Sequence, residues 1–99
     1  MRNVGVFTCG TATSIYECNK GENVPWHKHS NMHGHYVLRG KTRVEVYGQP
    51  EVYMDNKDKN LELPPNIWHK VTAMEDDTIF IHISYFNKDD TTELRNDAE

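Results

Sequence analysis

The sequence predicts an all-β fold, a small sandwich or barrel built from one domain. Short runs of β-branched and aromatic residues recur along the 99-residue chain, separated by turn-forming Gly, Asn and Pro. No segment has the 3.6-residue apolar period of an amphipathic helix. The chain has no internal repeat or low-complexity linker, and its length is typical of a single domain. Eight or more short strands joined by turns are therefore expected.

The first half of the chain contains four expected strands. Each is rich in β-branched or aromatic residues and is followed by a turn or a Gly, as in the Asn-Lys-Gly-Glu-Asn turn of residues 19–23. These strands are residues 3–9, 13–18, 24–29 and 36–40.

The second half continues the pattern up to residue 86. Residues 41–48 alternate, with Val44 and Val46 on one face of the expected strand and Arg43 and Glu45 on the other. The other strands are expected at residues 51–54, 61–63, 69–74 and 78–86. We therefore expect one barrel domain over residues 1–86. The polar residues 87–99 are expected to be a tail that frays or forms a short surface turn.

Composition and charge exclude several classes of partner. The net charge is −4 and the pI is near 5.8, which argues against nucleic acid or an anionic membrane as the partner. No apolar run is long enough to span a membrane, and the start lacks the apolar stretch of a signal peptide, so a cytoplasmic location is expected. In such a compartment Cys9 and Cys18 are expected to be reduced thiols on neighbouring strands, with a cross-strand disulfide as the alternative.

Histidines are the feature that points to chemistry. Four of the six in the chain lie between residues 27 and 35. Residues two apart on a strand share a face, so His27 and His29 form one pair and His33 and His35 form another. If the fold brings these strands side by side, three or four imidazoles converge in its interior. His69 follows the Pro64–Pro65 break and could add a ligand from across the sheet.

These residues resemble the two motifs of the cupins. The first, G-x5-H-x-H-x3,4-E-x6-G, matches from Gly21 to Gly40, with His33 where the family usually has Glu. The second, G-x5-P-x-G-x2-H-x3-N, matches at Pro64 and His69. Asp58, Asn66 and Ala73 replace its two Gly and its Asn; Asn66 is a mild change, because Asn also adopts the left-handed conformation. The resemblance covers about residues 13–86.

The resemblance implies a small double-stranded β-helix, or jelly-roll barrel, that binds one divalent metal ion. The implied ligands are His27, His29, His33 and His69. Imidazole suits Zn, Cu, Fe and Ni, and the candidate ions are Fe, Mn, Ni and Zn. With four neutral imidazoles the ion would keep its full charge, be a stronger Lewis acid and favour an anionic ligand. Two further histidines, His35 and His82, are candidates for acid or base catalysis. Parity does not decide which face of its strand His82 occupies.

Three functions follow from such a site. The first is an isomerase or lyase acting on a small oxygen-rich substrate such as a ketose, a uronate or another carboxylate. The second is a non-haem iron dioxygenase, and the third is a non-catalytic module that binds a metal or a small ligand. In each case the partner is a small molecule. Because exposed edge strands gain by packing, and cupins of this size commonly pair, a homodimer is also expected.

Overall fold

The computed structural model describes residues 2–8, 12–85 and 91–94, and it confirms the predicted all-β class. Ten strands follow one another along these ranges, with no helix among them. Accordingly, nothing in the described ranges is a helix long and apolar enough to cross a membrane. The strands are β1 (Arg2–Thr8), β2 (Ala12–Cys18), β3 (Asn23–His29), β4 (His33–Arg39), β5 (Lys41–Val46), β6 (Val52–Asp55), β7 (Leu61–Leu63), β8 (His69–Ala73), β9 (Thr78–Ser84) and β10 (Thr92–Leu94).

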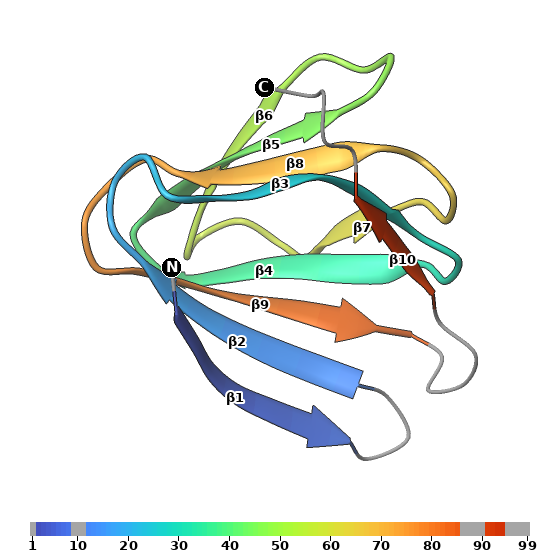
Figure 1. Cartoon of the computed structure of the whole chain (residues 1–99). Helices are drawn as coiled ribbons and strands as arrows, with labels where there is room; N and C mark the ends of the chain where they lie inside the picture. The colour runs from blue at the N-terminus through green and yellow to red at the C-terminus, as the bar shows by residue number, and fades with distance from the viewer. Residues whose placement is uncertain (1, 9–11, 86–90, 95–99) are drawn as a thin grey trace.

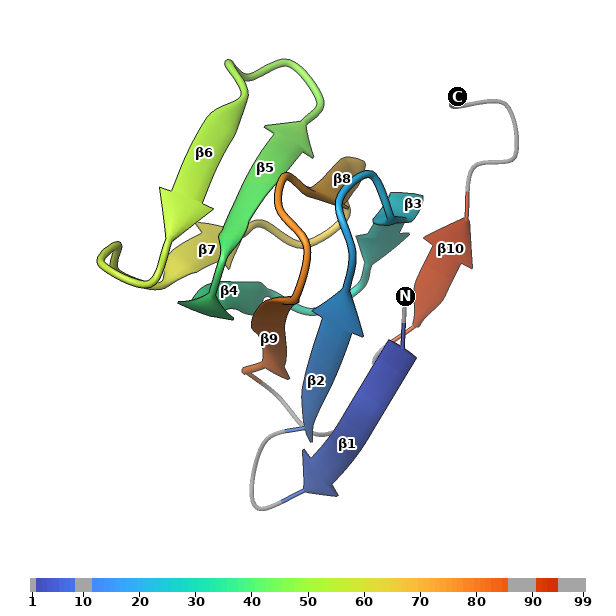
Figure 2. The same ribbon diagram turned by 90° about the vertical axis from the view of Figure 1, so that its left-hand side faces the viewer.

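The strands form two antiparallel sheets that pack face to face (Figures 1 and 2). One sheet has the order β1-β2-β9-β4-β7 and the other β10-β3-β8-β5-β6. The chain crosses between the sheets repeatedly, so that β3 and β4, joined by residues 30–32, belong to opposite sheets. This winding is the expected double-stranded β-helix.

Apolar side chains fill one part of the space between the sheets, and buried histidines fill another. Aliphatic and aromatic side chains fill one part, among them Val44, Val71 and Phe80, each at most 1% exposed. Strand β9 shows how the period of two divides its residues: Phe80, His82 and Ser84 face inward and are buried, while the isoleucines between them face outward. The inward position of His82, which parity left open, is thereby resolved.

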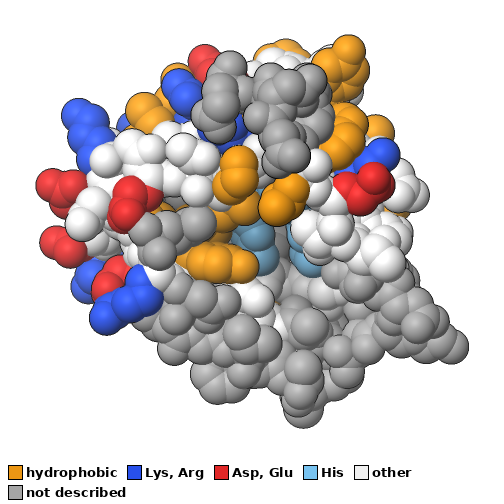
Figure 3. All heavy atoms as spheres, in the orientation of Figure 1, with side chains coloured by type: hydrophobic (Ala, Val, Ile, Leu, Met, Phe, Trp, Pro, Cys, Tyr) orange, Lys and Arg blue, Asp and Glu red, His pale blue; other side chains and the backbone are white. Residues whose placement is uncertain are grey.

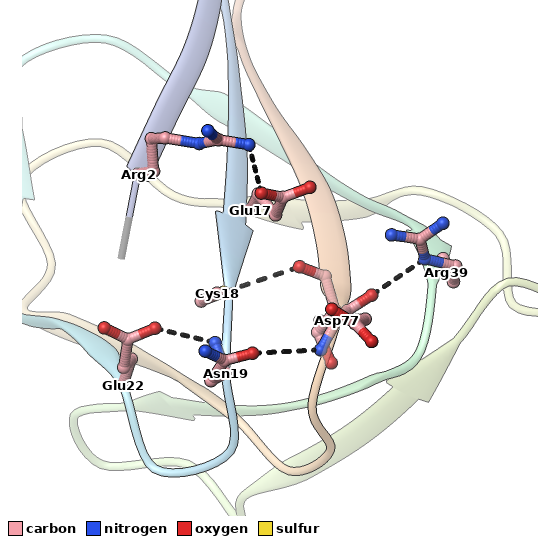
Figure 4. Close-up of polar contacts among 8 residues, drawn as sticks. Arg2, Glu17, Cys18, Asn19, Glu22, Arg39 and Asp77 are labelled. Atoms are coloured by element: carbon pink, nitrogen blue, oxygen red, sulfur yellow. Dashed lines mark hydrogen bonds and ion pairs between the residues drawn. The ribbon is translucent and has the colours of Figure 1, made fainter.

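Turns at one end tie the two sheets together (Figure 4). The backbone N–H of Asp77 donates to the side-chain oxygen of Asn19 at 3.3 Å, and Arg39 Nε donates to the carbonyl of Asp77 at 2.8 Å. Arg2 pairs with Glu17 on the neighbouring strand. These contacts connect the β2–β3 turn, the β8–β9 turn and the end of β4, and so hold the sheets in register.

The end of the chain differs from expectation. Thr92–Leu94 does not fray or form a surface turn but adds strand β10 to the edge of the second sheet, pairing with His27–His29 of β3. Cys18 is a buried free thiol with its sulfur 3.7 Å from the carbonyl of Thr78. Cys9, the other cysteine of the predicted pair of thiols or cross-strand disulfide, lies outside the described residues.

Gly40 allows the tight connection between β4 and β5. Its φ of +84° is in the left-handed region that favours glycine. A Cβ at this position would lie 2.9 Å from Thr78 Cα and would also meet Thr78 Oγ1. Both the conformation and the close approach of β9 therefore require glycine here.

We expect Gly40→Ala to lower the free energy of unfolding more than Gly48→Ala. Gly48 has a similar φ of +81°, but a Cβ there would meet nothing within 4 Å. Gly48→Ala should therefore cost only the left-handed conformation, about 1–2 kcal/mol. Gly40→Ala should add an overpacking cost of about 1–3 kcal/mol. Urea unfolding of both variants measures the difference, and equal losses would contradict the steric role of Thr78.

Candidate metal centre

Three histidines meet inside the second sheet. His27 and His29 lie on β3, two residues apart on its inner face, and His69 on β8 is the direct cross-strand partner of His27. One ring nitrogen from each lies within 4.8 Å of the others. His69, expected from across the sheet, is on the strand next to β3. The β3–β8 pairing shifts register between Val24 and His27, which allows the two histidines to face one another.

Hydrogen bonds orient each of the three rings. His27 Nδ1 donates to the carbonyl of Pro25 at 2.6 Å, and His69 Nδ1 donates to the carbonyl of Ile67 at 3.0 Å. His29 Nδ1 lies 3.0 Å from the hydroxyl of Thr92 on β10. In His27 and His69 the hydrogen bond at Nδ1 leaves Nε2 as the nitrogen available to an ion, the arrangement by which proteins hold metal-binding imidazoles.

The cluster fits a divalent metal ion. Imidazole nitrogens suit Zn, Cu, Fe and Ni, and three protein ligands with an open position are typical of catalytic zinc sites. His69 Nε2 is buried and has no hydrogen-bond partner among the described residues, a costly state that an ion would relieve. Ligating histidines must be neutral, and burial favours that form: it lowers the pKa of His69 to about 4 and also lowers the pKa of His27.

His33, the fourth expected ligand, reaches the cluster from the other sheet. Because β3 and β4 belong to opposite sheets, they face each other across the interior and do not lie side by side. The His33 ring stacks on that of His29, with centroids 3.7 Å apart and planes 13° apart. It lies beside the three-histidine cluster rather than within the 4.8 Å group.

His35 and His82 form a separate pair next to this cluster. They are direct cross-strand partners on β4 and β9, and His82 Nε2 lies 3.0 Å from His35 Nδ1. The other nitrogen of His35, Nε2, lies 2.8 Å from the hydroxyl of Thr42 on β5. Burial lowers the pKa of His35 to about 3 and holds the pKa of His82 well below its ordinary value, so both rings are neutral near pH 7.

A cavity of about 280 Å³ opens beside these histidines. His27, His29, His33 and His82 line it, together with polar and aromatic groups that include Tyr16. In the space-filling view, histidine atoms are visible at the bottom of the hollow between the sheets (Figure 3). These four histidines thus border a space that opens to solvent, whereas His69 lies behind them and does not line it.

Two threonines of the site were not foreseen from the sequence. Thr42 contacts His35, and Thr92 contacts His29. Thr42 stands on the same alternating face as Val44, a signal for burial but not for contact with a histidine. Thr92 lies in a polar segment without strand periodicity, and no sequence signal connects it to residue 29.

Comparison with known proteins agrees with the geometry. A family model described as the cupin domain matches residues 14–84. A comparison with curated protein sequences finds no match.

Several solved structures share the fold. A cupin-like protein from Thermotoga maritima is 25% identical, with a TM-score of 0.75 over 87% of this chain and 65% of its own. The DMSP lyase DddQ from Ruegeria pomeroyi is 15% identical, with a TM-score of 0.74 over 86% of this chain and 43% of its own. Oxalate decarboxylase from Bacillus subtilis is 17% identical, with a TM-score of 0.72 over 86% and 24%. The chain spans less than two thirds of each of these proteins. Because the family model matches most of it, the chain belongs to the cupin family.

Proposed function

We propose that this cupin is a metal-dependent enzyme, an isomerase or lyase that acts on a small oxygen-rich molecule such as a ketose, a uronate or another carboxylate. The observation that carries the proposal is the cluster of His27, His29 and His69, with nitrogens within 4.8 Å of one another beside an open cavity. A structural metal site is closed by four protein ligands, whereas a catalytic one keeps a position for substrate. The open cavity favours the catalytic alternative.

The metal is proposed to be Fe, Mn, Ni or Zn, bound by His27, His29 and His69, with His33 as the fourth ligand; for catalysis the coordination of the ion must expand beyond these four to admit the substrate. No carboxylate replaces a histidine in this set, so the ion's charge would remain available to an anionic substrate. Manganese is the first ion to test, because Mn(II) centres are named in work on the structurally similar oxalate decarboxylase of Bacillus subtilis.

The cavity supports a small substrate. Its volume of about 280 Å³ is at the lower end of the range for ligand sites, roughly 300–1,000 Å³. When bound, the ion would supply Lewis acidity toward a carbonyl or carboxylate oxygen. The chain itself contributes orientation by the polar groups of the wall and exclusion of water by Tyr16 and Val24. His82, paired with His35, is the histidine placed to exchange a hydrogen bond with the substrate.

Metal analysis followed by turnover assays tests the function. Protein purified without added metal is analysed for Fe, Mn, Ni and Zn, and then assayed with ketoses, uronates and small carboxylates in air and without oxygen. The proposal expects product under both atmospheres. Turnover that requires iron and consumes oxygen would instead identify a dioxygenase, and metal binding without any turnover would identify a binding module.

We expect His29→Ala and His69→Ala each to lose most of the bound metal, because the close group of three imidazoles is reduced to two and His33 lies beside it rather than within it. Metal content after dialysis, measured by mass spectrometry, checks this. Tyr47→Ala, a 67% exposed position, is the control that should keep full occupancy. Stoichiometric metal in His69→Ala would show that the ligand set is wrong.

His33→Glu separates a catalytic from a structural role for the fourth ligand. The change restores the carboxylate of the family motif, so the metal should stay bound while the reactivity changes, because the carboxylate lowers the charge at the ion. If this variant fails to fold, the site is structural.

A homodimer is also proposed, through the outer face of β4 and β9. Ile79, Ile81 and Ile83 face outward on β9, and the neighbouring β4 exposes Tyr36 (38%) and Leu38 (45%). Ile81 is the cross-strand partner of Tyr36 on one side and of Ile15 on the other, which makes a continuous apolar row. A continuous apolar row on the outer face of a sheet marks a surface that a partner can cover.

We expect Ile81→Lys to convert a dimer into a monomer, because the charge would be buried in the proposed interface. Light scattering after size-exclusion chromatography measures the mass. Val52→Lys, on the exposed edge strand β6, is the matched control that should leave the mass unchanged. A wild-type monomer, or a dimer that survives Ile81→Lys, would contradict the proposed face.

A further inference from the structure

We infer that Thr42 sets the direction of a hydrogen-bond chain through His35 to His82, so that His82 presents an N–H group to the cavity. The ligand group opposite His82 is then an oxygen acceptor, a carbonyl or a carboxylate. The ligand part of this inference rests on the proposed function, whereas the direction of the chain does not.

The chain of contacts crosses the interior from one sheet to the other. Thr42 lies on β5 of the second sheet, and His35 and His82 lie on β4 and β9 of the first. Thr42 Oγ1 is 2.8 Å from His35 Nε2, and His35 Nδ1 is 3.0 Å from His82 Nε2. Thr42 and His35 are 0% exposed and His82 is 7% exposed.

Two proton arrangements satisfy these distances. A deeply buried imidazole with no carboxylate beside it stays neutral, so each ring carries one proton. In the first arrangement Thr42 donates to His35 Nε2, His35 Nδ1–H donates to His82 Nε2, and the proton of His82 is on Nδ1. In the second every bond is reversed: His82 Nε2–H donates to His35, His35 donates to Thr42, and His82 Nδ1 is a bare acceptor.

The hydroxyl of Thr42 decides between them. In the second arrangement Thr42 Oγ1 accepts, and its own O–H needs another acceptor. Among the described residues His35 is the one hydrogen-bond partner of this hydroxyl, and Thr42 is fully buried. A fully buried donor without a partner is costly, whereas the first arrangement satisfies Thr42 and leaves as its free donor the N–H of His82, which borders the cavity and can bind water or a ligand. Thr42 is therefore the donor that fixes the tautomer of both histidines.

The consequence is a donor at the cavity wall. His82 lines the cavity, and its Nε2 is occupied by His35, so Nδ1–H is the group left for a ligand. A neutral imidazole N–H can polarise a carbonyl or bind a carboxylate oxygen, and it can stabilise negative charge that develops there. It does not accept a proton from the substrate. Thr42 and His35 are positioning residues that act through His82.

Nitrogen-15 NMR of the histidine rings in metal-free protein tests the chain, because protonated and bare ring nitrogens resonate far apart. His82 is assigned by comparison with His82→Gln. In the wild type we expect Nδ1 of His82 and Nδ1 of His35 to be protonated. A bare Nδ1 on His82 would overturn the inference even if no variant folds, and the result does not depend on metal binding or turnover.

Two variants test the role of the hydroxyl. Thr42→Val removes the donor at nearly constant volume and should abolish the single tautomer, so that Nδ1 of His82 becomes partly unprotonated. Thr42→Ser keeps the donor and should retain the wild-type ring signals. An unchanged tautomer in Thr42→Val would show that Thr42 does not set the direction.

Oxalate is the probe for the ligand. With manganese-loaded protein, calorimetry should show oxalate binding that weakens several-fold in Thr42→Val, up to about a hundredfold for complete loss of a hydrogen bond to a charged acceptor. Thr42→Ser should bind as the wild type does. Equal affinities in all three proteins, or no oxalate binding, would overturn the ligand role of His82. If the protein binds none of Fe, Mn, Ni and Zn, the proposed function is contradicted while the NMR result stands; if it binds one of them but not Mn, the titration is done with that ion.

Discussion

Burial of imidazole between two sheets is the constraint on which this site depends. All six histidines of the chain are buried, and each ring nitrogen removed from water needs a partner. Some of these partners are backbone carbonyls two residues away in the sequence, those of Pro25 and Ile67. Others are threonine hydroxyls on distant strands. The nitrogens that remain converge at one place. The histidine cluster thus forms where hydrogen bonds hold one nitrogen of a ring and the other nitrogen is turned toward the neighbouring imidazoles.

The three clustered histidines and the His35–His82 pair lie on different sheets. The second sheet holds His27, His29 and His69 on adjacent strands, where the antiparallel register fixes their separation. The first sheet brings His82 and His35 to the opposite wall of the interior. A small molecule between the sheets would therefore meet a metal ion on one side and a neutral imidazole on the other. Rigid strands hold both walls, and tied turns at the far end keep them in place.

Much of this arrangement could be predicted from the sequence, because it follows from local rules. The period of two correctly placed His27 with His29 and His33 with His35, and the turn residues bounded most strands. Asn66 has a φ of 60°, as its position in the second motif required. The arrangement of the sheets could not be predicted in the same way. That β3 and β4 face each other, that His69 pairs with His27, and that Thr42 meets His35 all depend on contacts between distant segments, which no short pattern encodes.

Strand β10 has a consequence for the order in which the histidine cluster is assembled. Its three residues complete the orientation of His29 through Thr92, 63 positions away in the chain. During synthesis the imidazoles of β3 emerge early, yet this support arrives only when the last strand docks. Such long-range closure is slow compared with hairpin formation. The imidazole of His29 would accordingly gain its full orientation only once this edge strand has docked, so a metal ion of the proposed kind would meet a less ordered cluster before that step.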